Sequence, residues 1–330
     1  MRPSRRLSGP PEHRGNAQIS EAAGRSVLHN EANLMVPKPD ETNFTGNTCS
    51  VLGTLSLLTP WDVLDCGKIR IGHDHDGGYV MLDRLRPEQP VLSYGVGPDI
   101  SFDLDLAMRG HRVFMFDHTV DAPPSALPSG ALFTREGVAA EPQPEKQMET
   151  LESHLRRHAL LGRRDVILKM DIEGSEWRVL SSLPEELLDV FEQIVVEFHW
   201  LNGLGNKDFA TMARKCLQGL NARFTLCHVH ANNHVNFRLV EGIIVPPVIE
   251  ATYIRSELVS RTPNRTLYPT EHDRGNKLGV KDMILSIFPF VPMAVPFSDL
   301  QLLAQRLDAE HAERIRSGPS APAPDRSAKD

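Results

Sequence analysis

The chain has 330 residues, of which 40% are hydrophobic and 24% charged, as in an ordinary globular protein, and its net charge of −7 argues against a nucleic-acid partner. No apolar run approaches the length of a membrane span, and the N-terminal residues lack the apolar core of a signal peptide. We therefore expect no membrane span and a cytoplasmic location. The four cysteines form no CxxC pair, so neither a zinc site nor a disulfide framework is indicated.

Both ends of the chain are predicted to be disordered tails. Residues 1–50 place arginines among proline, glycine, serine and asparagine without a periodic apolar pattern, and residues 317–330 are of low complexity. Between these tails we expect an N-terminal extension with a hairpin (51–89), a central α/β domain (90–256) and a C-terminal extension (257–316).

The first structural signal along the chain is the sequence IRIGHDHDGGYVML, residues 69–82. Asp76-Gly77 between β-type residues predicts a hairpin, because a tight hairpin turn requires positive φ. His73 and His75 would then share one face of a strand, which permits metal ligation. We favour the simpler interpretation, a hairpin tip that carries solvated polar residues.

Buried-type strands alternate with helices through the middle of the chain, which predicts a mostly parallel sheet covered on both faces. The last two strands are too close in sequence for a crossover helix, so they are expected to be antiparallel. The expected strands are 90–97, 111–119, 131–140 (weaker), 165–174, 191–200, 223–233 and 238–255, and the expected helices are 100–110, 148–162, 175–183 and 207–219.

A glycine turn and an acid end the first two of these strands. The turn is Gly95-Val96-Gly97, and Asp117 ends the following strand. Ligands of doubly wound sheets bind outside the carboxyl ends of the strands, where a carboxylate can accept two ribose hydroxyls. The pattern favours a nucleoside site over a tight turn followed by a helix-capping aspartate.

The helix that follows this turn begins in acidic sequence. Ile100 stands where a dinucleotide fingerprint has its third glycine, and Asp99, Asp103 and Asp105 surround the helix start. Negative charge there opposes a pyrophosphate and suits a cation. S-adenosylmethionine carries a sulfonium and no phosphate, so the pattern favours this methyl donor over NAD.

These motifs together resemble the FkbM-type family of S-adenosylmethionine-dependent methyltransferases, in a methyltransferase-like branch with DGGY upstream. The resemblance covers roughly residues 65–255 and, more loosely, 267–277. It implies a class I methyltransferase fold, Rossmann-like, α/β, with a seven-stranded mostly parallel sheet and an antiparallel terminal strand. It also implies cofactor contacts at the Gly95-Val96-Gly97 turn and Asp117, extending to Glu136. The motifs are SYGVGPDISFDLDLAMRG, VFMFDHT, VILKMDIEGSEWRVL and IVVEFHWL.

The sequence KMDIEGSE places three carboxylates around one glycine at the end of the fourth strand. In this fold that strand lies beside the first, so Asp171 and Glu173 are candidates to meet the cofactor or the acceptor. Glu176 falls in the first turn of the next helix, where a carboxylate is favourable, and is predicted to be structural.

Two further strands are predicted to bring polar groups to the same rim. The fifth supplies Glu197 and His199, and the sixth supplies His228, His230 and Asn232. A histidine, His199 or His230, could act with Asp171 as the base for an acceptor hydroxyl. Alternatively, Asp171, Glu197, His199 and a sixth-strand histidine could hold a divalent metal. The metal-free alternative is favoured, because no ligand spacing is diagnostic of a metal.

The resulting prediction is an O-methyltransferase that acts on a hydroxyl of a small molecule or glycan. An NAD(P)-dependent oxidoreductase is the alternative enzyme, and a catalytically inactive domain that binds a nucleoside or a protein is the alternative without catalysis. The missing third glycine and the antiparallel terminal pair disfavour the oxidoreductase. The sequence carries no signal of the oligomeric state.

Overall fold

The computed structural model describes residues 47–292 and 297–317. The predicted disordered tails therefore lie largely outside the described residues. The last residues of the predicted N-terminal tail, which was expected to reach residue 50, already belong to helix α1 (Thr48–Leu55). This helix is ordered by packing, because Val51 and Leu55 are fully buried. The proposed division of the chain into segments otherwise stays a prediction.

The seven strands of the central sheet run in the order β11-β14-β10-β9-β4-β5-β6. All neighbours are parallel except at β14, which is antiparallel to both β10 and β11. This arrangement confirms the predicted α/β sheet, with the last strand in chain order inserted beside the fifth. The strands are β4 (Pro90–Tyr94), β5 (Arg112–Phe116), β6 (Ala131–Thr134), β9 (Val166–Met170), β10 (Phe191–Phe198), β11 (Phe224–Ala231) and β14 (Ile249–Arg255).

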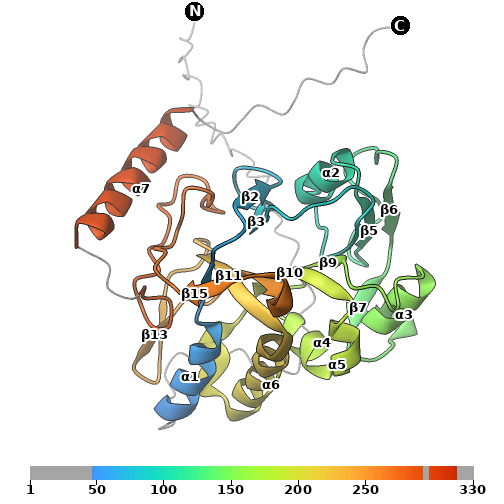
Figure 1. The fold of residues 1–330 in the computed structure, drawn as a ribbon, viewed down its shortest axis with the longest axis horizontal. Helices are drawn as coiled ribbons and strands as arrows, with labels where there is room; N and C mark the ends of the chain where they lie inside the picture. The colour runs from blue at the N-terminus through green and yellow to red at the C-terminus, as the bar shows by residue number, and fades with distance from the viewer. Residues whose placement is uncertain (1–46, 293–296, 318–330) are drawn as a thin grey trace, which may run out of the picture. The chain divides into compact units, whose positions relative to one another are not determined.

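Helices and the N-terminal hairpin cover the two faces of this sheet. Figure 1 shows α2 and the β2–β3 hairpin on one face, and α1, α4 and α6 on the other. The helices are α2 (Ser101–Met108), α3 (Leu151–Arg157), α4 (Glu176–Ser182), α5 (Glu185–Leu188), α6 (Lys207–Arg223) and α7 (Phe297–Ser317). Short 3-10 turns cover Ser56–Leu58, Pro144–Lys146, Leu201–Gly205 and Ser256–Leu258.

Three expected elements are divided in the structure. The weak third strand gives β6 and then β7 (Gly137–Ala139). The helix expected over 148–162 begins instead as the strand β8 (Met148–Thr150), which pairs with β7 and precedes α3. The final strand is broken at Glu241-Gly242, where both residues have positive φ. The chain there forms a hairpin of β12 (Arg238–Val240) and β13 (Ile243–Val245) before β14 begins.

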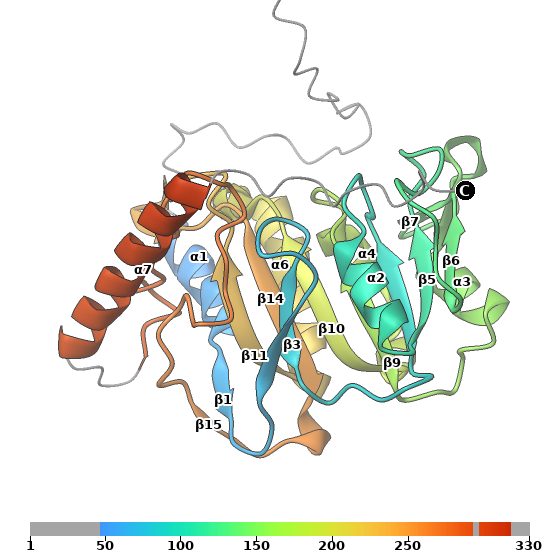
Figure 2. The same cartoon turned by 90° about the horizontal axis from the view of Figure 1, so that it is seen from above.

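The predicted N-terminal hairpin forms, but with a longer connection. Strands β2 (Lys68–Ile71) and β3 (Tyr79–Leu82) pair antiparallel, and residues 72–78 join them in place of a tight turn. His73 and His75 therefore lie in the connecting loop and not on a strand face. Figure 2 shows the hairpin lying across the sheet face near β14 and β10.

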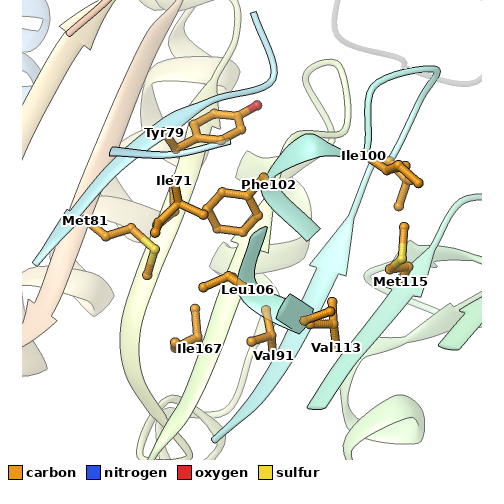
Figure 3. Packing of buried hydrophobic residues seen from close by; sticks show 13 residues of the cluster. Ile71, Tyr79, Met81, Val91, Ile100, Phe102, Leu106, Val113, Met115 and Ile167 are labelled. Atoms are coloured by element: carbon orange, nitrogen blue, oxygen red, sulfur yellow. The ribbon is translucent and has the colours of Figure 1, made fainter. Parts of the chain in front are cut away.

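Side chains of the sheet fix the hairpin on this face. The amide of Gln193 on β10 accepts from the backbone N–H of Leu82 and donates to its carbonyl, each at 3.1 Å. Apolar packing continues the contact beneath α2, where Tyr79 meets Phe102 edge to face with ring centroids 5.5 Å apart. Figure 3 shows Ile71 and Met81 of the hairpin packed in the same cluster as sheet residues such as Ile167. The hairpin thus lies along this face of the sheet, and only its Tyr79 end reaches the carboxyl ends of β9 and β10, near Asp171 and Glu197.

The C-terminal part of the chain returns to the sheet. Strand β15 (Arg261–Pro263) pairs with β1 (Trp61–Val63), and residues 264–292, which we call the C-terminal segment, continue without regular strands or helices. Helix α7 binds this segment through Arg314, whose guanidinium donates to the carbonyl of Gly275 at 3.0 Å. In the described residues, no helix is long and apolar enough to cross a membrane.

Candidate active site

The glycine turn after β4 is shaped by contact with the neighbouring strand. Gly95 and Gly97 both have positive φ, +73° and +56°. A Cβ on Gly95 would lie 1.4 Å from the carbonyl oxygen of Asp171, so no side chain fits there. A Cβ on Gly97 would meet nothing within 4 Å, so the backbone of Gly97 borders open space. The turn thus offers its backbone to a ligand on one side and touches the end of β9 on the other. Val96 between them is buried in the core, so its backbone alone faces this region.

Asp117 follows β5 and points to the same turn. Its Oδ2 accepts from the N–H of Gly97 at 2.9 Å, and its Oδ1 accepts from the N–H and the hydroxyl of Thr119 at 2.7 and 2.6 Å. Burial by itself would raise the pKa of Asp117, but the hydrogen bonds from Thr119 and Gly97 outweigh burial and lower it. The carboxylate is therefore ionised, and its remaining lone pairs can accept hydroxyl groups.

Glu136, the third acid assigned to the cofactor, has other partners. Its carboxylate accepts from the buried ring of His154 at 2.8 Å and forms an ion pair with Arg157. The other ring nitrogen of His154 lies 2.9 Å from the hydroxyl of Tyr94. Glu136 thus belongs to an internal chain of polar groups that supports β4, and its role as a cofactor ligand stays a prediction without support from its placement.

Asp171 lies directly after β9, with its side chain 23% exposed. Its Oδ2 accepts a hydrogen bond of 2.9 Å from the hydroxyl of Tyr79, and the ammonium of Lys169 is 3.7 Å from the same oxygen. Lys169 also donates to the carbonyl of Gly95 at 2.6 Å, so one buried lysine joins the glycine turn to the carboxylate. The sequence alone gives no sign that Tyr79, the last residue of the DGGY motif, belongs to the site.

The turn after Asp171 is organised by Glu176, which is fully buried. Its Oε1 accepts from the N–H groups of Ile172 and Gly174 at 2.8 and 3.2 Å, as expected for a structural carboxylate. The same oxygen lies 3.1 Å from Nδ1 of His199. Glu176 therefore also orients the histidine, a contact between two elements that its position in the sequence does not reveal.

His199 lies at the end of β10 among carboxylates. Its Nε2 is 3.5 Å from Glu173 and 4.0 Å from Asp171. Burial by itself would lower the pKa of His199, but the negative charges of Glu176, Glu197 and Asp171 outweigh burial and raise it well above the usual range. An imidazole that is already protonated cannot accept the proton of an acceptor, so this ring would have to lose its proton before it could serve as a base.

Glu197 lies two residues before His199, and its carboxyl group has partners of its own. Its carboxyl accepts from Asn232 at 2.7 Å and lies 3.4 Å from the hydroxyl of Tyr79, whose single proton is donated to Asp171. Burial, followed by the nearby charge of Asp171, raises the pKa of Glu197 well above its usual range. Tyr79 thus bridges two acids, one exposed to the site and one buried behind it.

The structure does not bring His230 to this rim. The ring is fully buried, with Nδ1 3.1 Å from Glu250 and Nε2 3.0 Å from Asp282 of the C-terminal segment. Its neighbour on the same strand face, His228, binds Asp273 of that segment at 2.7 Å. Both histidines attach the C-terminal segment to β11, so His230 is not placed to act on an acceptor, and the expectation that it is a base is not supported.

Two groups among the described residues have metal-ligand spacing. Asp171, Glu173 and His199 place one ligand atom each within 4.8 Å of one another, and so do His73, His75 and Asp99. The metal set considered from the sequence, which included Glu197 and a sixth-strand histidine, is not formed, because those side chains are occupied elsewhere. The sequence could indicate Asp171 and His199 through their positions at strand ends, but Glu173 joins them only through the shape of the turn.

A family model matches the part of the chain that forms this site. Residues 79–226 match the family model described as the methyltransferase FkbM domain. Among solved structures, the chain is similar to a putative hemolysin from Streptococcus thermophilus, with a TM-score of 0.31 and 9% identity, over 73% of this chain and 82% of that one. No curated protein matches the chain.

Proposed function

We propose that this chain transfers the methyl group of S-adenosylmethionine to a hydroxyl of a small molecule or glycan. Residues 79–226 match the methyltransferase FkbM domain, which makes the chain an S-adenosylmethionine-dependent methyltransferase. The observation that carries the proposal is the contact between Gly95 and the carbonyl of Asp171. Through this contact the glycine turn and the carboxylate rim are two walls of one site.

The cofactor would lie along the turn. Gly97 leaves its backbone open, and the ionised Asp117 accepts the ribose hydroxyls, as acids at this position do in doubly wound sheets. The sulfonium would then face the edge of β9, where Asp171 supplies negative charge. The proposal assigns cofactor contacts to the backbone of Gly95, Val96 and Gly97 and to the carboxylates of Asp117 and Asp171.

The acceptor would enter on the exposed side of Asp171. Methyl transfer is a displacement in which the acceptor oxygen attacks the methyl carbon as the carbon–sulfur bond breaks, so alignment supplies much of the rate. The hydroxyl also loses its proton, which passes to the carboxylates of the rim and then to solvent. Asp171, held by Tyr79 and Lys169, is fixed in position to align the hydroxyl. The nature of the acceptor and the cytoplasmic location remain predictions from the sequence.

Binding and transfer can be measured separately. By calorimetry, S-adenosylmethionine and S-adenosylhomocysteine should bind and NAD should not. Asp117→Ala should weaken cofactor binding by roughly tenfold to a hundredfold, since a hydrogen bond to a charged group contributes about 1.5–3 kcal/mol. Asp121→Asn, at a carboxylate that is 89% exposed, is the matched control and should bind normally.

Asp171→Asn removes the charge that faces the sulfonium, so it should weaken S-adenosylmethionine binding more than S-adenosylhomocysteine binding. At saturating cofactor it should still lose most methyl transfer from isotope-labelled cofactor to hydroxyl compounds. The position of the methyl group would be read by mass spectrometry. NAD binding without a response to either methyl-donor species would overturn the cofactor assignment, and transfer to nitrogen alone would overturn the hydroxyl acceptor.

A further inference from the structure

We propose that Asp171, Glu173 and His199 bind one divalent cation that accepts both oxygen and nitrogen ligands, with Mn²⁺ as the representative ion. Binding of the ion stands on the geometry of these three side chains alone. Its role in catalysis, set out below, rests on the proposed function.

The spacing of the three side chains suits a shared ion. Nε2 of His199 is 3.5 Å from Oε2 of Glu173 and 4.0 Å from Oδ1 of Asp171, and the three ligand atoms lie within 4.8 Å of one another. Ligands bound to one ion at about 2.0–2.2 Å are separated by roughly 3–4.4 Å, according to the angle between them. The two separations from Nε2 of His199 lie in this range, and they are long for direct hydrogen bonds.

The histidine is oriented in the manner of a metal ligand. Its Nδ1 lies 3.1 Å from the fully buried carboxylate of Glu176, and ligating histidines usually donate their second ring nitrogen to such a group. Nε2 is thereby directed at Asp171 and Glu173, and within the described residues it makes no aligned hydrogen bond. The residue is only 8% exposed, so burial and the contact of Nδ1 with Glu176 together restrict rotation of the ring.

The same buried carboxylate places the third ligand. Glu176 accepts the N–H groups of Ile172 and Gly174, the residues on either side of Glu173. Glu173 is therefore held at the top of a fixed turn, with its side chain 66% exposed. A cation in this position can be reached from solvent and can keep open positions for water or a second ligand.

The three carboxylates around His199 outnumber the two cationic groups at the rim, the ring of His199 and the ammonium of Lys169, and a bound ion would take the place of the proton on Nε2. Asp171, Glu173 and Glu176 all approach His199, while Lys169 is 3.7 Å from Asp171 and is shared with the glycine turn. A divalent ion would offset this negative charge. Two carboxylates with one imidazole form a donor set that Mn²⁺ accepts, because carboxylate and water ligands suit it and imidazole does not exclude it.

An ion here has a direct use in the proposed reaction. An acceptor hydroxyl bound at an open position of the ion would lose its proton to solvent more readily, because coordination lowers the pKa of a bound hydroxyl. The resulting alkoxide would attack the methyl carbon while the electron pair of the carbon–sulfur bond returns to sulfur. Asp171 would use Oδ1 for the ion, since Oδ2 accepts from Tyr79.

The test is metal binding by the chelator-treated full-length chain, without cofactor or acceptor. Titration with Mn²⁺, followed by calorimetry and by the resonance signal of free Mn²⁺, should show one saturable site. Glu173→Gln and His199→Gln should each weaken it at least tenfold, and Glu176→Gln should weaken it about tenfold to a hundredfold through the histidine. Asp99→Asn is the matched control in the second cluster, and it should leave the affinity unchanged.

Unfolding curves of each variant establish that the fold is kept, and the exposed Glu173 gives the variant least able to disturb it. Absence of a saturable site in the wild-type chain would overturn the proposal. A site that survives Glu173→Gln and is lost with Asp99→Asn would also overturn it. If Mn²⁺ binds as expected but chelator leaves methyl transfer unchanged, the catalytic role of the ion is wrong and the site stands. Mn²⁺ binding with no transfer to any hydroxyl would contradict the proposed function separately.

Discussion

Gly95 and Gly97 share one turn and have similar backbone conformations, but their surroundings predict different effects of mutation. A Cβ at Gly95 would lie 1.4 Å from the carbonyl of Asp171, whereas a Cβ at Gly97 would meet nothing within 4 Å. Gly95→Ala must therefore separate β4 from β9 and should destabilise the fold by more than about 3 kcal/mol. Gly97→Ala suffers only the positive φ, about 1–2 kcal/mol, and should lose cofactor affinity because its methyl group enters the open space.

Urea unfolding measures the first difference, and calorimetry with S-adenosylhomocysteine measures the second. Equal destabilisation by the two alanines would contradict the packing argument. Normal cofactor affinity in Gly97→Ala would show that the open space beside this glycine is not the binding site.

The residues of the site differ in how far the sequence could indicate them. Asp171 and His199 follow directly from the rule that parallel strands deliver their last residues to one edge. Tyr79 does not, because it reaches Asp171 from 92 positions away through a hairpin whose place on the sheet depends on packing. The placement of His230 away from the rim could not be predicted for a similar reason: its partners Glu250 and Asp282 approach from a strand and a segment that the pattern of polar residues does not position.

At the scale of elements, the central strands could be predicted because their apolar runs are continuous and each ends in a polar or glycine residue. The expected antiparallel pair is confirmed by β11 and β14. The β12–β13 hairpin was missed because the sequence RLVEGIIV reads as one apolar run, although Glu241 and Gly242 turn the chain back. The strand β8 was taken for the first turn of a helix because Met148 fits the helical period.

Attachment of the C-terminal segment to β11 predicts a pH effect on stability. Burial lowers the pKa of His228 to about 4, so the ring is neutral and donates to Asp273. In the unfolded chain its pKa is about 6.5, so the unfolded state binds the extra proton first. The contribution of His228 is therefore complete above pH 6.5 and is lost as the pH falls towards 4.

Between pH 7 and pH 5, the wild-type chain should lose about 2 kcal/mol more unfolding free energy than His228→Gln, as the proton linkage of one such histidine requires. Glutamine can still donate to Asp273, so this variant removes the titration and keeps the contact. Denaturant unfolding at the two pH values gives the comparison. Equal losses would show that His228 is not held neutral in the fold. The pKa of His230 shifts in the opposite direction, because Asp282 and Glu250 raise it against the effect of burial. His230 is present in both the wild-type chain and the variant, so its contribution cancels in the comparison.

At the scale of the whole molecule, the fold class could be predicted because the order of strands and helices leaves few topologies, and the glycine turn with Asp117 marks the edge used for binding. The completed site could not be predicted from the sequence. Its walls come from the sheet edge, from the β2–β3 hairpin and from the turn held by Glu176, and their meeting depends on contacts such as Gln193 with Leu82 that no local pattern encodes.

Truncation of the chain tests which parts beyond the sheet contribute to stability. Residues 1–40 and 318–330 lack a periodic apolar pattern, so their removal should leave the melting temperature nearly unchanged. Removal of residues 297–330 should be different, because it deletes α7, on which Leu303 and Leu307 are 7% and 3% exposed.

Burying two leucines stabilises the fold by about 1.5–3 kcal/mol each. For a domain of this size each kcal/mol shifts the melting temperature by about 2–4 °C. The longer truncation should therefore melt roughly 6–24 °C lower than the wild-type chain, and the shorter ones should match it. Leu303→Ala with Leu307→Ala in the full-length chain is the matched control, and should reproduce much of the loss without removing any backbone. If the longer truncation melted with the wild-type chain, α7 would not be part of the folded core; if the short truncations melted early, the tails would contribute contacts that their sequences do not predict.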